Sequence, residues 1–215
     1  MLERFSLPPM LPGFEPRYNI YPSQQQWIIA RGRSGKARLG QLRWGLIPSW
    51  ADDPSIGNRM TNVRAESLTG KPAWSTPLRT QRCLVLADGY YEWKVVGKGR
   101  APYYFKLSDG RAFGLAGLWD RWEKGNSMIG TCTVITTSAS KRALAYHHRM
   151  PVLLTEETAA AWLDPEASPA ELKSLMVGYD SEDLEMYPVS RYVNDPANDS
   201  AECIQRIDDG ILERR

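Results

Sequence analysis

Three polar side chains that could take part in catalysis lie far apart in the sequence, each in a short segment that also carries aromatic or basic residues: Asn62, Glu92 and His147. An imidazole gains and loses its proton near neutral pH. A carboxyl group that faces a cavity keeps its proton to higher pH than in water, because burial disfavours the charged form. Glu92 and His147 could therefore support general acid–base catalysis.

Spacing alone leaves a structural alternative open for each of them. Asn62 could cap a turn. Glu92 lies in an alternating segment, with Tyr90 on its own side and Tyr91 on the other. If that side faces water, Glu92 is a surface ion-pair partner instead of a proton donor. His147 could donate a hydrogen bond to the carbonyl groups at the end of a helix.

Positive charge is concentrated in the first part of the chain. Residues 1–150 contain 22 Lys or Arg and 10 Asp or Glu, whereas residues 151–215 contain 5 and 15, which gives net charges of +12 and −10. A basic body suggests a face that meets an anion, although the two parts could simply attract each other. Arg64 and Arg149 could therefore be phosphate clamps or members of structural ion pairs. The 8 Trp and 10 Tyr could stack on single-stranded nucleic acid or fill the core.

Composition excludes several classes of protein and site. The chain has 2 histidines, and its 3 cysteines form no CxxC pair, so we expect no disulfide framework, no metal site and no cofactor. No GxGxxG or P-loop motif supports nucleotide binding. No apolar run reaches the roughly 18 residues of a membrane span and no signal peptide is visible, so we expect a cytoplasmic protein. The absence of a heptad repeat or a large apolar edge favours a monomer.

Short apolar or alternating runs between turn signals predict strands. The expected strands cover residues 27–31, 38–44, 82–87, 103–107, 112–118, 129–137 and 151–154. Residues 106–118 predict a hairpin that turns at Ser108-Asp109-Gly110. Helices are expected over residues 141–146, 156–163 and 168–177, the last beginning with a capping box of Ser168 and Glu171. This order predicts one α+β domain around a strongly bent, mostly antiparallel β-sheet with a few peripheral helices.

As a set, the motifs resemble one family, the SRAP (SOS response-associated peptidase) proteins, which process abasic sites. The resemblance runs from about residue 4 to about residue 207, with matching segments at Pro16–Gln24, Leu42–Trp50, Met60–Glu66, Arg82–Lys94, Phe113–Trp119 and His147–Val152. It implies a single SRAP-like domain over residues 1–215 with a barrel-like core.

The resemblance also implies a reaction. The family sensor binds single-stranded DNA and attaches covalently to abasic sites through an N-terminal cysteine, which protects the lesion during the DNA damage response. The α-amine forms a Schiff base with the aldehyde of the opened sugar, and the thiol then closes a thiazolidine ring. Amine and thiol lie on adjacent carbons, so ring closure has a high effective molarity. The family name further implies a peptidase activity that would release a propeptide ahead of the cysteine.

Each candidate residue receives a role from the resemblance. Asn62 would hold the opened sugar or the N-terminus. Glu92 would move protons during ring opening and Schiff-base formation, and His147 would assist these steps and their reversal. Phosphates on either side of the lesion would be clamped by Arg64 and Arg149. Residues that would line the DNA groove or lie near the site are Trp50, Trp93, Arg17 and Asn19.

One departure from the family pattern lies beside the predicted catalytic histidine. The family usually has an acid at the position of His148. If that acid orients the catalytic imidazole, His147 could have a different tautomer in this chain.

The larger departure is at the N-terminus. The family begins Met-Cys-Gly-Arg-Phe, whereas this chain begins Met1-Leu2-Glu3-Arg4-Phe5. Only 11 residues separate Phe5 from Arg17, fewer than in the family, so we expect the start with its cysteine to lie upstream. The alternative is a non-covalent single-stranded DNA-binding module that has lost the nucleophile. A thiazolidine needs its amine and thiol on one residue, which rules out Cys83, Cys132 and Cys203.

Overall fold

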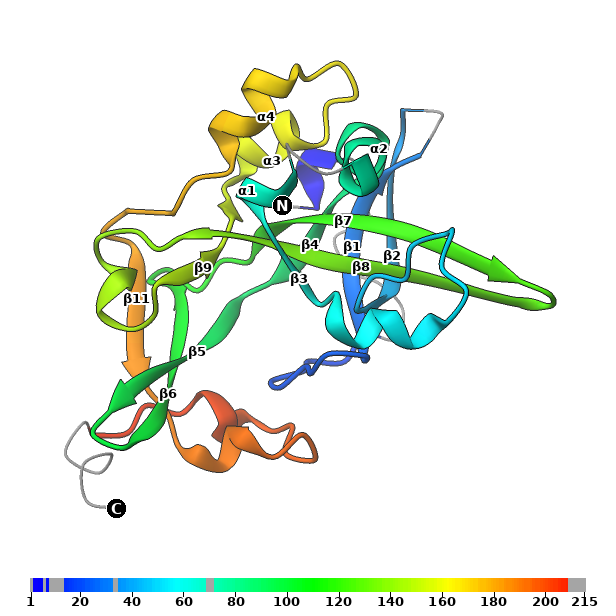
Figure 1. Ribbon diagram of the computed structural model, residues 1–215. Coiled ribbons are helices and arrows are strands. Elements are labelled where there is room, and N and C mark those ends of the chain that lie inside the picture. Colours follow the sequence, from blue (N-terminus) through cyan, green and yellow to red (C-terminus); the bar gives the residue numbers. More distant parts are fainter. Residues whose placement is uncertain (1, 6, 8–13, 33–34, 69–71, 209–215) are drawn as a thin grey trace.

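A closed barrel of five strands forms the centre of the molecule (Figure 1). The computed structural model describes residues 2–5, 7, 14–32, 35–68 and 72–208. Around the barrel the strands are β1 (Gln25–Arg31), β2 (Ala37–Trp44), β8 (Ser127–Ser138), β7 (Phe113–Lys124) and β4 (Arg82–Ala87). Neighbours are antiparallel except β2 and β8, which run parallel. The predicted α+β domain with a bent, mostly antiparallel sheet is confirmed, and the bend closes into a barrel.

Strand β8 continues beyond the barrel and carries a short strand on each edge. On one edge β3 (Asn62–Arg64) runs parallel to it, with Arg64 opposite Thr136. On the other edge β9 (Arg149–Pro151) runs antiparallel, with Pro151 opposite the same Thr136. A further short strand, β10 (Leu153–Leu154), pairs with β7. The end of β8 therefore brings the Asn62 segment and the segment after His147 to its two sides.

A second sheet packs against the barrel in the order β11 (Leu184–Pro188), β6 (Gly99–Leu107) and β5 (Gly89–Val96). Phe105 of β6 and Val134 of β8 belong to one buried apolar cluster, which joins the two sheets. Among the strands that the structure describes, β5 pairs only with β6 and lies at the edge of this sheet, so that Glu92 is opposite Tyr103.

The predicted hairpin over residues 106–118 is wrong. Ser108-Asp109-Gly110 does form a turn, in which the Gly110 N–H donates to the Leu107 carbonyl at 2.9 Å. However, β6 pairs with β5 and β11, whereas β7 pairs with β4, β8 and β10. The turn therefore carries the chain from one sheet to the other. Alternation identifies a strand, but it does not say which other strand will pair with it.

Four helices lie at one end of the barrel (Figure 1): α1 (Ala65–Leu68), α2 (Pro72–Thr80), α3 (Glu156–Trp162) and α4 (Pro169–Leu175). The predicted capping box of α4 is confirmed, because Ser168 and Glu171 each accept the backbone N–H of the other. Short 3-10 turns are η1 (Glu3–Phe5), η2 (Pro54–Arg59), η3 (Ala143–Ala145), η4 (Arg191–Asn194) and η5 (Ala201–Ile204). The helix expected over residues 141–146 is thus only the turn η3. Within the described residues, no helix is long and apolar enough to cross a membrane.

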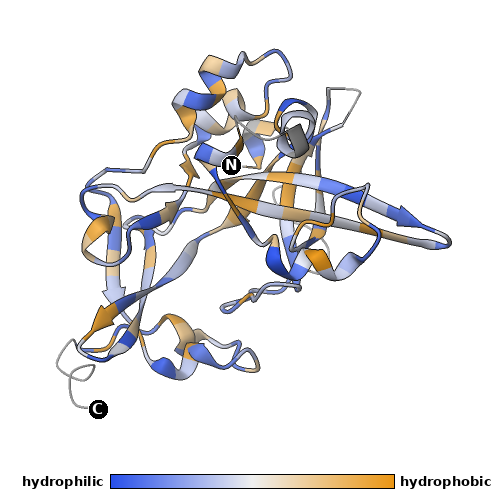
Figure 2. Ribbon diagram, in the orientation of Figure 1, coloured by the Kyte–Doolittle hydropathy of each residue, from blue (hydrophilic) through white to orange (hydrophobic). Residues whose placement is uncertain are grey.

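The helices are attached to the barrel by apolar packing and by a buried arginine. Figure 2 shows apolar residues along the barrel strands, and Trp162 of α3 lies fully buried on them. Arg82, at the start of β4, is 6% exposed. Its guanidinium donates to carbonyl groups at the ends of α2 and α3, including Leu78 at 2.6 Å and Trp162 at 2.7 Å. These carbonyls have no partner within their own helices, so Arg82 caps both helices.

We expect Arg82→Met to destabilise the protein by about 3 kcal/mol, because the change leaves several buried carbonyl groups without donors. The matched control is Arg79→Met, which removes an exposed guanidinium from α2 and should change stability by less than about 0.5 kcal/mol. Urea unfolding followed by circular dichroism measures both. Equal losses in the two variants would contradict the capping role.

Candidate functional site

Glu92 and His147, 55 positions apart in the sequence, meet in the folded chain. The Glu92 Oε2 atom lies 3.3 Å from His147 Nδ1, and the two side chains are 20% and 33% exposed. Alternation along β5 places Glu92 on the same side as Tyr90 and Lys94. On that side the Lys94 ammonium lies 5.1 Å from the centre of the ring of Tyr146, the residue directly before His147. The carboxyl group therefore faces the loop that carries the imidazole and does not face open water.

The environment of Glu92 changes its acidity. Burial raises the pKa of Glu92 to about 7, and the neighbouring His147 offsets part of this rise. Near neutral pH the carboxyl group is then present in both protonated and ionised forms. A group in this condition can give up a proton in one step of a reaction and take one in another.

The imidazole of His147 is held by the backbone two residues further on. Its Nδ1 atom lies 3.0 Å from the carbonyl oxygen of Arg149, which can only accept a hydrogen bond. The backbone N–H of Arg149 lies 3.3 Å from the same atom, so Nδ1 donates to the carbonyl in one tautomer and accepts from the N–H in the other. The His148 ring lies beside it, with centroids 4.3 Å apart and planes tilted by 52°.

Asn62 and Arg64 form a separate part of the site. Both side chains are exposed on the same side of β3, while Val63 between them is buried. Neither side chain makes a hydrogen bond or ion pair with any other residue that the structure describes. The structure therefore brings Glu92 and His147 into contact, and it places Asn62 on the opposite edge of β8 from the strand that follows His147.

Arg149, predicted to clamp a phosphate, is engaged within the protein. Its two terminal nitrogens donate to the two carboxylate oxygens of Glu66, at 2.8 and 3.0 Å. One of them also donates to the Thr136 carbonyl at 2.6 Å. The hydrogen bonds from Arg149 hold the pKa of Glu66 below its usual range. Glu66 was not predicted, although it lies two positions after Arg64 in the same motif.

The other predicted DNA-binding residues occupy different surroundings. Trp50 is 66% exposed and open to a ligand. The indole of Trp93 donates to Asn194 at 2.8 Å, and Arg17 pairs with Asp199. Asn19 is buried, and its amide donates to the carbonyl groups of Val193, Asp195 and Asn198.

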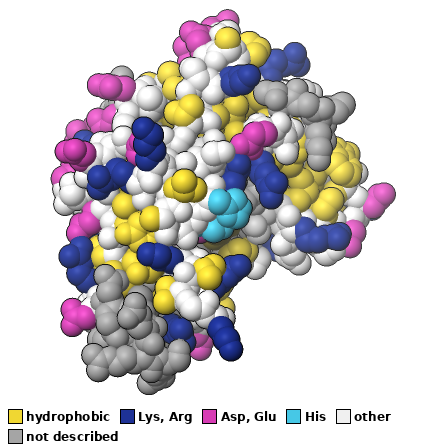
Figure 3. Space-filling view, turned by 60° about the vertical axis from the view of Figure 1, so that its left-hand side comes forward, with side chains coloured by type: hydrophobic (Ala, Val, Ile, Leu, Met, Phe, Trp, Pro, Cys, Tyr) yellow, Lys and Arg dark blue, Asp and Glu magenta, His cyan; other side chains and the backbone are white. Residues whose placement is uncertain are grey.

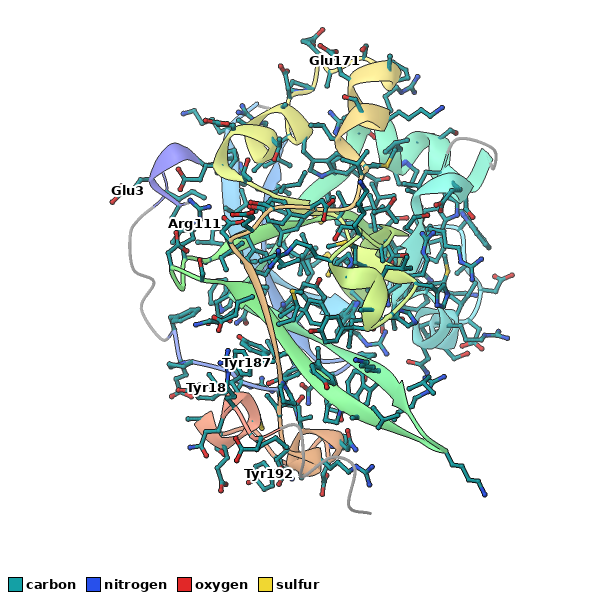
Figure 4. The ribbon with its side chains drawn as sticks, turned by 90° about the vertical axis from the view of Figure 1, so that its left-hand side faces the viewer. Glu3, Tyr18, Arg111, Glu171, Tyr187 and Tyr192 are labelled. Carbon is teal, nitrogen blue, oxygen red and sulfur yellow. The ribbon has the colours of Figure 1, made fainter. Side chains whose placement is uncertain are left out.

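Burial argues against direct contact between Asn19 and DNA. Instead, Asn19 joins the N-terminal segment to the C-terminal 3-10 turns. Tyr18 belongs to the same end of the molecule, where Figure 4 shows it near Tyr187.

A groove of about 300 Å³ begins at His147, and Glu92 is not part of its lining. It is lined by Trp93, Lys94, Val95, Arg100, Leu144, Ala145, Tyr146, His147 and His148. The lining includes two cations and two imidazoles, and it includes no carboxylate. Figure 3 shows the histidines at the surface with basic side chains around them. Lys94 and Arg100 were not singled out from the sequence, although Lys94 shares its side of β5 with Glu92.

The cysteines lie away from this surface. Cys83, Cys132 and Cys203 are fully buried. Burial raises the pKa of the Cys132 thiol to about 12, so it stays protonated and unreactive at neutral pH. The described residues contain no group of three or more His, Cys, Asp and Glu side chains that could hold a metal ion.

Comparisons with known proteins point to one family. A family model described as SOS response associated peptidase (SRAP) matches residues 3–196. The chain is 43% identical over 211 residues to abasic site processing protein YoqW of Bacillus subtilis (strain 168), which covers 95% of this chain and 93% of the relative. It is 32% identical over 230 residues to abasic site processing protein HMCES of Gallus gallus, covering 92% and 68%.

A solved structure agrees with this relationship. A protein from Bacteroides thetaiotaomicron matches with a TM-score of 0.76 and 30% sequence identity, over 86% of this chain and 82% of that chain. The barrel and its added strands are therefore a fold that occurs in more than one species.

The raised pKa of Glu92 predicts a pH-dependent effect on stability. The folded-state pKa of Glu92 is about 7, above the ordinary 4.5. The free energy of unfolding is therefore highest below about pH 4.5 and falls as pH rises through 7. Gln cannot ionise at this position. We therefore expect the melting temperature of Glu92→Gln, relative to that of the wild type, to be higher at pH 8 than at pH 5.

Thermal unfolding at the two pH values measures this gain. Glu123→Gln is the control, since Glu123 is an exposed partner of Arg121 and should give the same difference from the wild type at both values. A Glu92→Gln difference that does not grow with pH would show that the carboxyl group is not kept neutral by burial.

Proposed function

This chain belongs to the SOS response associated peptidase (SRAP) family, and on that premise we propose that it processes abasic sites in DNA. It binds single-stranded DNA and, in a form with an N-terminal cysteine, links covalently to the ring-opened sugar. The observation that carries the proposal is the contact between Glu92 and His147, whose imidazole lines a basic groove.

Glu92 is suited to the first step, the opening of the sugar ring. The closed hemiacetal must lose a proton from its C1 hydroxyl while the ring oxygen gains one. A carboxyl group with a pKa of about 7 can supply one of these protons and receive the other. The product is an aldehyde that an amine can attack.

The same pair serves the covalent steps. The N-terminal amine adds to the aldehyde, and the adduct loses water to form an imine once its hydroxyl has been protonated. The thiol then adds to the imine carbon, and its proton passes to the nitrogen, which closes the thiazolidine ring. One water leaves in total, and nothing is oxidised or reduced. His147, whose Nδ1 atom lies beside the Arg149 backbone and the Glu92 carboxyl group, relays these protons.

Exposed residues around the pair supply DNA contacts. Arg64 and Asn62 lie together on β3, where Arg64 meets a phosphate and the Asn62 amide holds the opened sugar or the N-terminus. Trp50 offers an exposed ring for stacking on a base. The groove that begins at His147 presents Lys94 and Arg100 to the backbone of the strand. Trp93 shapes the groove wall, and Arg17 stabilises the adjoining segment through Asp199.

The N-terminal segment packs against the apolar core. Phe5 of η1 is buried in a cluster that also includes Val63 and Ala65. In the proposed reaction a residue ahead of η1 supplies the amine and thiol. Leu2 has no thiol, and the buried cysteines have no α-amine, so the chain without such a residue is proposed to bind DNA non-covalently.

The covalent step can be tested by extending the chain ahead of Leu2 with the start of an SRAP relative, so that the mature protein begins with cysteine. We expect an adduct with an abasic single-stranded oligonucleotide that survives denaturing electrophoresis. Glu92→Gln in the extended chain should slow its formation by roughly 100-fold, which is the usual scale of general acid–base catalysis.

The matched control is the same extension with serine in place of cysteine, and an undamaged oligonucleotide controls for the lesion. Adduct formation by the serine version would exclude the thiazolidine. An unchanged rate in Glu92→Gln would remove Glu92 from the mechanism.

Non-covalent binding can be tested on the chain as it is. We expect its affinity for undamaged single-stranded DNA to fall steeply as salt rises, because phosphate contacts release counterions. Arg64→Ala should lower the slope of log Kd against log salt by about 0.7, the amount for one lost contact with a single strand. Fluorescence anisotropy measures the slope.

The control for this experiment is Arg111→Ala. Arg111 is an exposed arginine that pairs with Asp109 and Asp183, so its loss should leave the slope unchanged. Equal slopes for the wild type and Arg64→Ala would contradict a phosphate contact at Arg64.

A further inference from the structure

We propose that Asp120 and Trp122 are positioning residues: from one face of β7 they hold the turn that carries Trp50, so that its indole is a preformed platform for a base of single-stranded DNA. The functional part of this inference rests on the stacking role that the proposed function gives to Trp50. The structural part, that these two side chains make the turn rigid, does not.

Trp50 lies at the tip of a tight turn over residues 48–51. The Ala51 N–H donates to the Pro48 carbonyl at 2.9 Å, which closes the turn and puts Trp50 at its third position. The indole is 66% exposed, and it makes no hydrogen bond or ring contact with another residue that the structure describes. The position of the ring therefore depends on the backbone on either side of it.

The residue before Trp50 is held by Asp120. The Ser49 N–H donates to Asp120 Oδ2 at 2.8 Å. The Oδ1 atom of the same carboxyl group accepts the Arg121 N–H at 2.8 Å and the Gln81 side-chain amide at 2.9 Å. Asp120 is 6% exposed, and these three donors fix its orientation, so the acceptor of the Ser49 N–H is itself held in place.

The residue after Trp50 is held by Trp122. The Trp122 indole N–H donates to the Ala51 carbonyl at 2.7 Å, and Trp122 packs with Ala51 and Ile47 in a small buried cluster. Asp120 and Trp122 are two positions apart on β7, so their side chains lie on the same face of the strand. This spacing places one hydrogen bond from β7 on each side of the exposed ring.

The segment that leads to the turn is also fixed relative to Asn62. The Leu46 N–H donates to the Met60 carbonyl at 3.0 Å, and the Trp44 indole donates to the Thr61 carbonyl at 2.8 Å, directly before Asn62. The turn and the amide proposed to hold the opened sugar or the N-terminus are therefore in place before DNA binds. A ring on rigid backbone loses little conformational entropy when a base stacks on it, so more of the stacking free energy contributes to affinity.

The structural part is tested on the chain as it is, without DNA. Nitrogen-15 relaxation gives the order parameter of the Trp50 backbone N–H, for which we expect about 0.85 in the wild type, the usual value of rigid backbone. Trp122→Phe removes the indole donor, and Asp120→Asn turns an NH₂ group toward the Ser49 N–H while its oxygen keeps the other two donors. In both variants we expect the order parameter to fall toward about 0.6, the range of flexible backbone. An unchanged value in Asp120→Asn would overturn the proposal, even if Trp122→Phe did not fold.

The matched control is Trp162→Phe. The Trp162 indole also donates to a buried backbone carbonyl, that of Cys83 at 3.0 Å, but it does so from α3. We expect Trp162→Phe to lose stability as Trp122→Phe does and to leave the Trp50 order parameter unchanged. An equal fall in this control would show a general loosening of the fold, and Asp120 and Trp122 would then have no special role.

The functional part is tested by a double-mutant cycle with an undamaged single-stranded oligonucleotide. We expect Trp122→Phe to raise Kd by about three- to tenfold, the range for the cost of ordering one side chain on binding. In the Trp50→Ala background the same substitution should change Kd by less than about twofold, because no ring is left to position. The slope of log Kd against log salt should stay that of the wild type, since the phosphate contacts are unchanged. Fluorescence anisotropy measures both quantities.

The other outcomes of the cycle are decisive as well. An equal rise in Kd with and without Trp50, no rise in either background, or a changed salt slope would each contradict the positioning role. If Trp50→Ala alone leaves Kd unchanged, the stacking role in the proposed function is refuted, and the functional part of this inference with it. The relaxation result would still decide whether Asp120 and Trp122 hold the turn.

Discussion

Burial of the Glu92 carboxyl group beside the His147 imidazole is the interaction on which the proposed chemistry depends. In water a glutamate is ionised at neutral pH and has no proton to give. On β5 the second sheet screens Glu92 from solvent, and burial raises its pKa to about 7 while His147 lies 3.3 Å away. Burying a carboxyl group in this way costs stability once it ionises. A fold that keeps such a group must compensate elsewhere, and the closed barrel with its large apolar core provides that compensation.

The barrel also explains how distant segments meet. Strand β8 is paired along most of its length and continues past the barrel, where β3 and β9 flank it. The residues that β3 and β9 carry, or that lie next to them, therefore have fixed places relative to one rigid strand. The ion pair of Glu66 and Arg149 reaches between these segments.

Much of this structure could be predicted from local signals. The capping box at Ser168, most of the strands and the burial of Cys83 and Cys132 depend on residues close in sequence or on side-chain type. Contacts between distant residues could not be predicted. The turn at Ser108-Asp109-Gly110 suggested a hairpin, because local pattern does not reveal that β6 pairs with β11. Likewise, a motif marks Arg149 as basic but cannot show that Glu66, 83 positions earlier, already occupies its guanidinium.

The proposed chemistry requires that Glu92 hold a proton near neutral pH. Carbon-13 NMR of the Glu92 side-chain carboxyl group, titrated from pH 3 to pH 9 and assigned by its absence in Glu92→Gln, measures this directly. The geometry predicts a midpoint near 7, coupled to a change in the His147 ring signals. A midpoint close to the ordinary value of 4.5 would contradict it, because Glu92 would then be fully ionised at neutral pH and could not act as the acid.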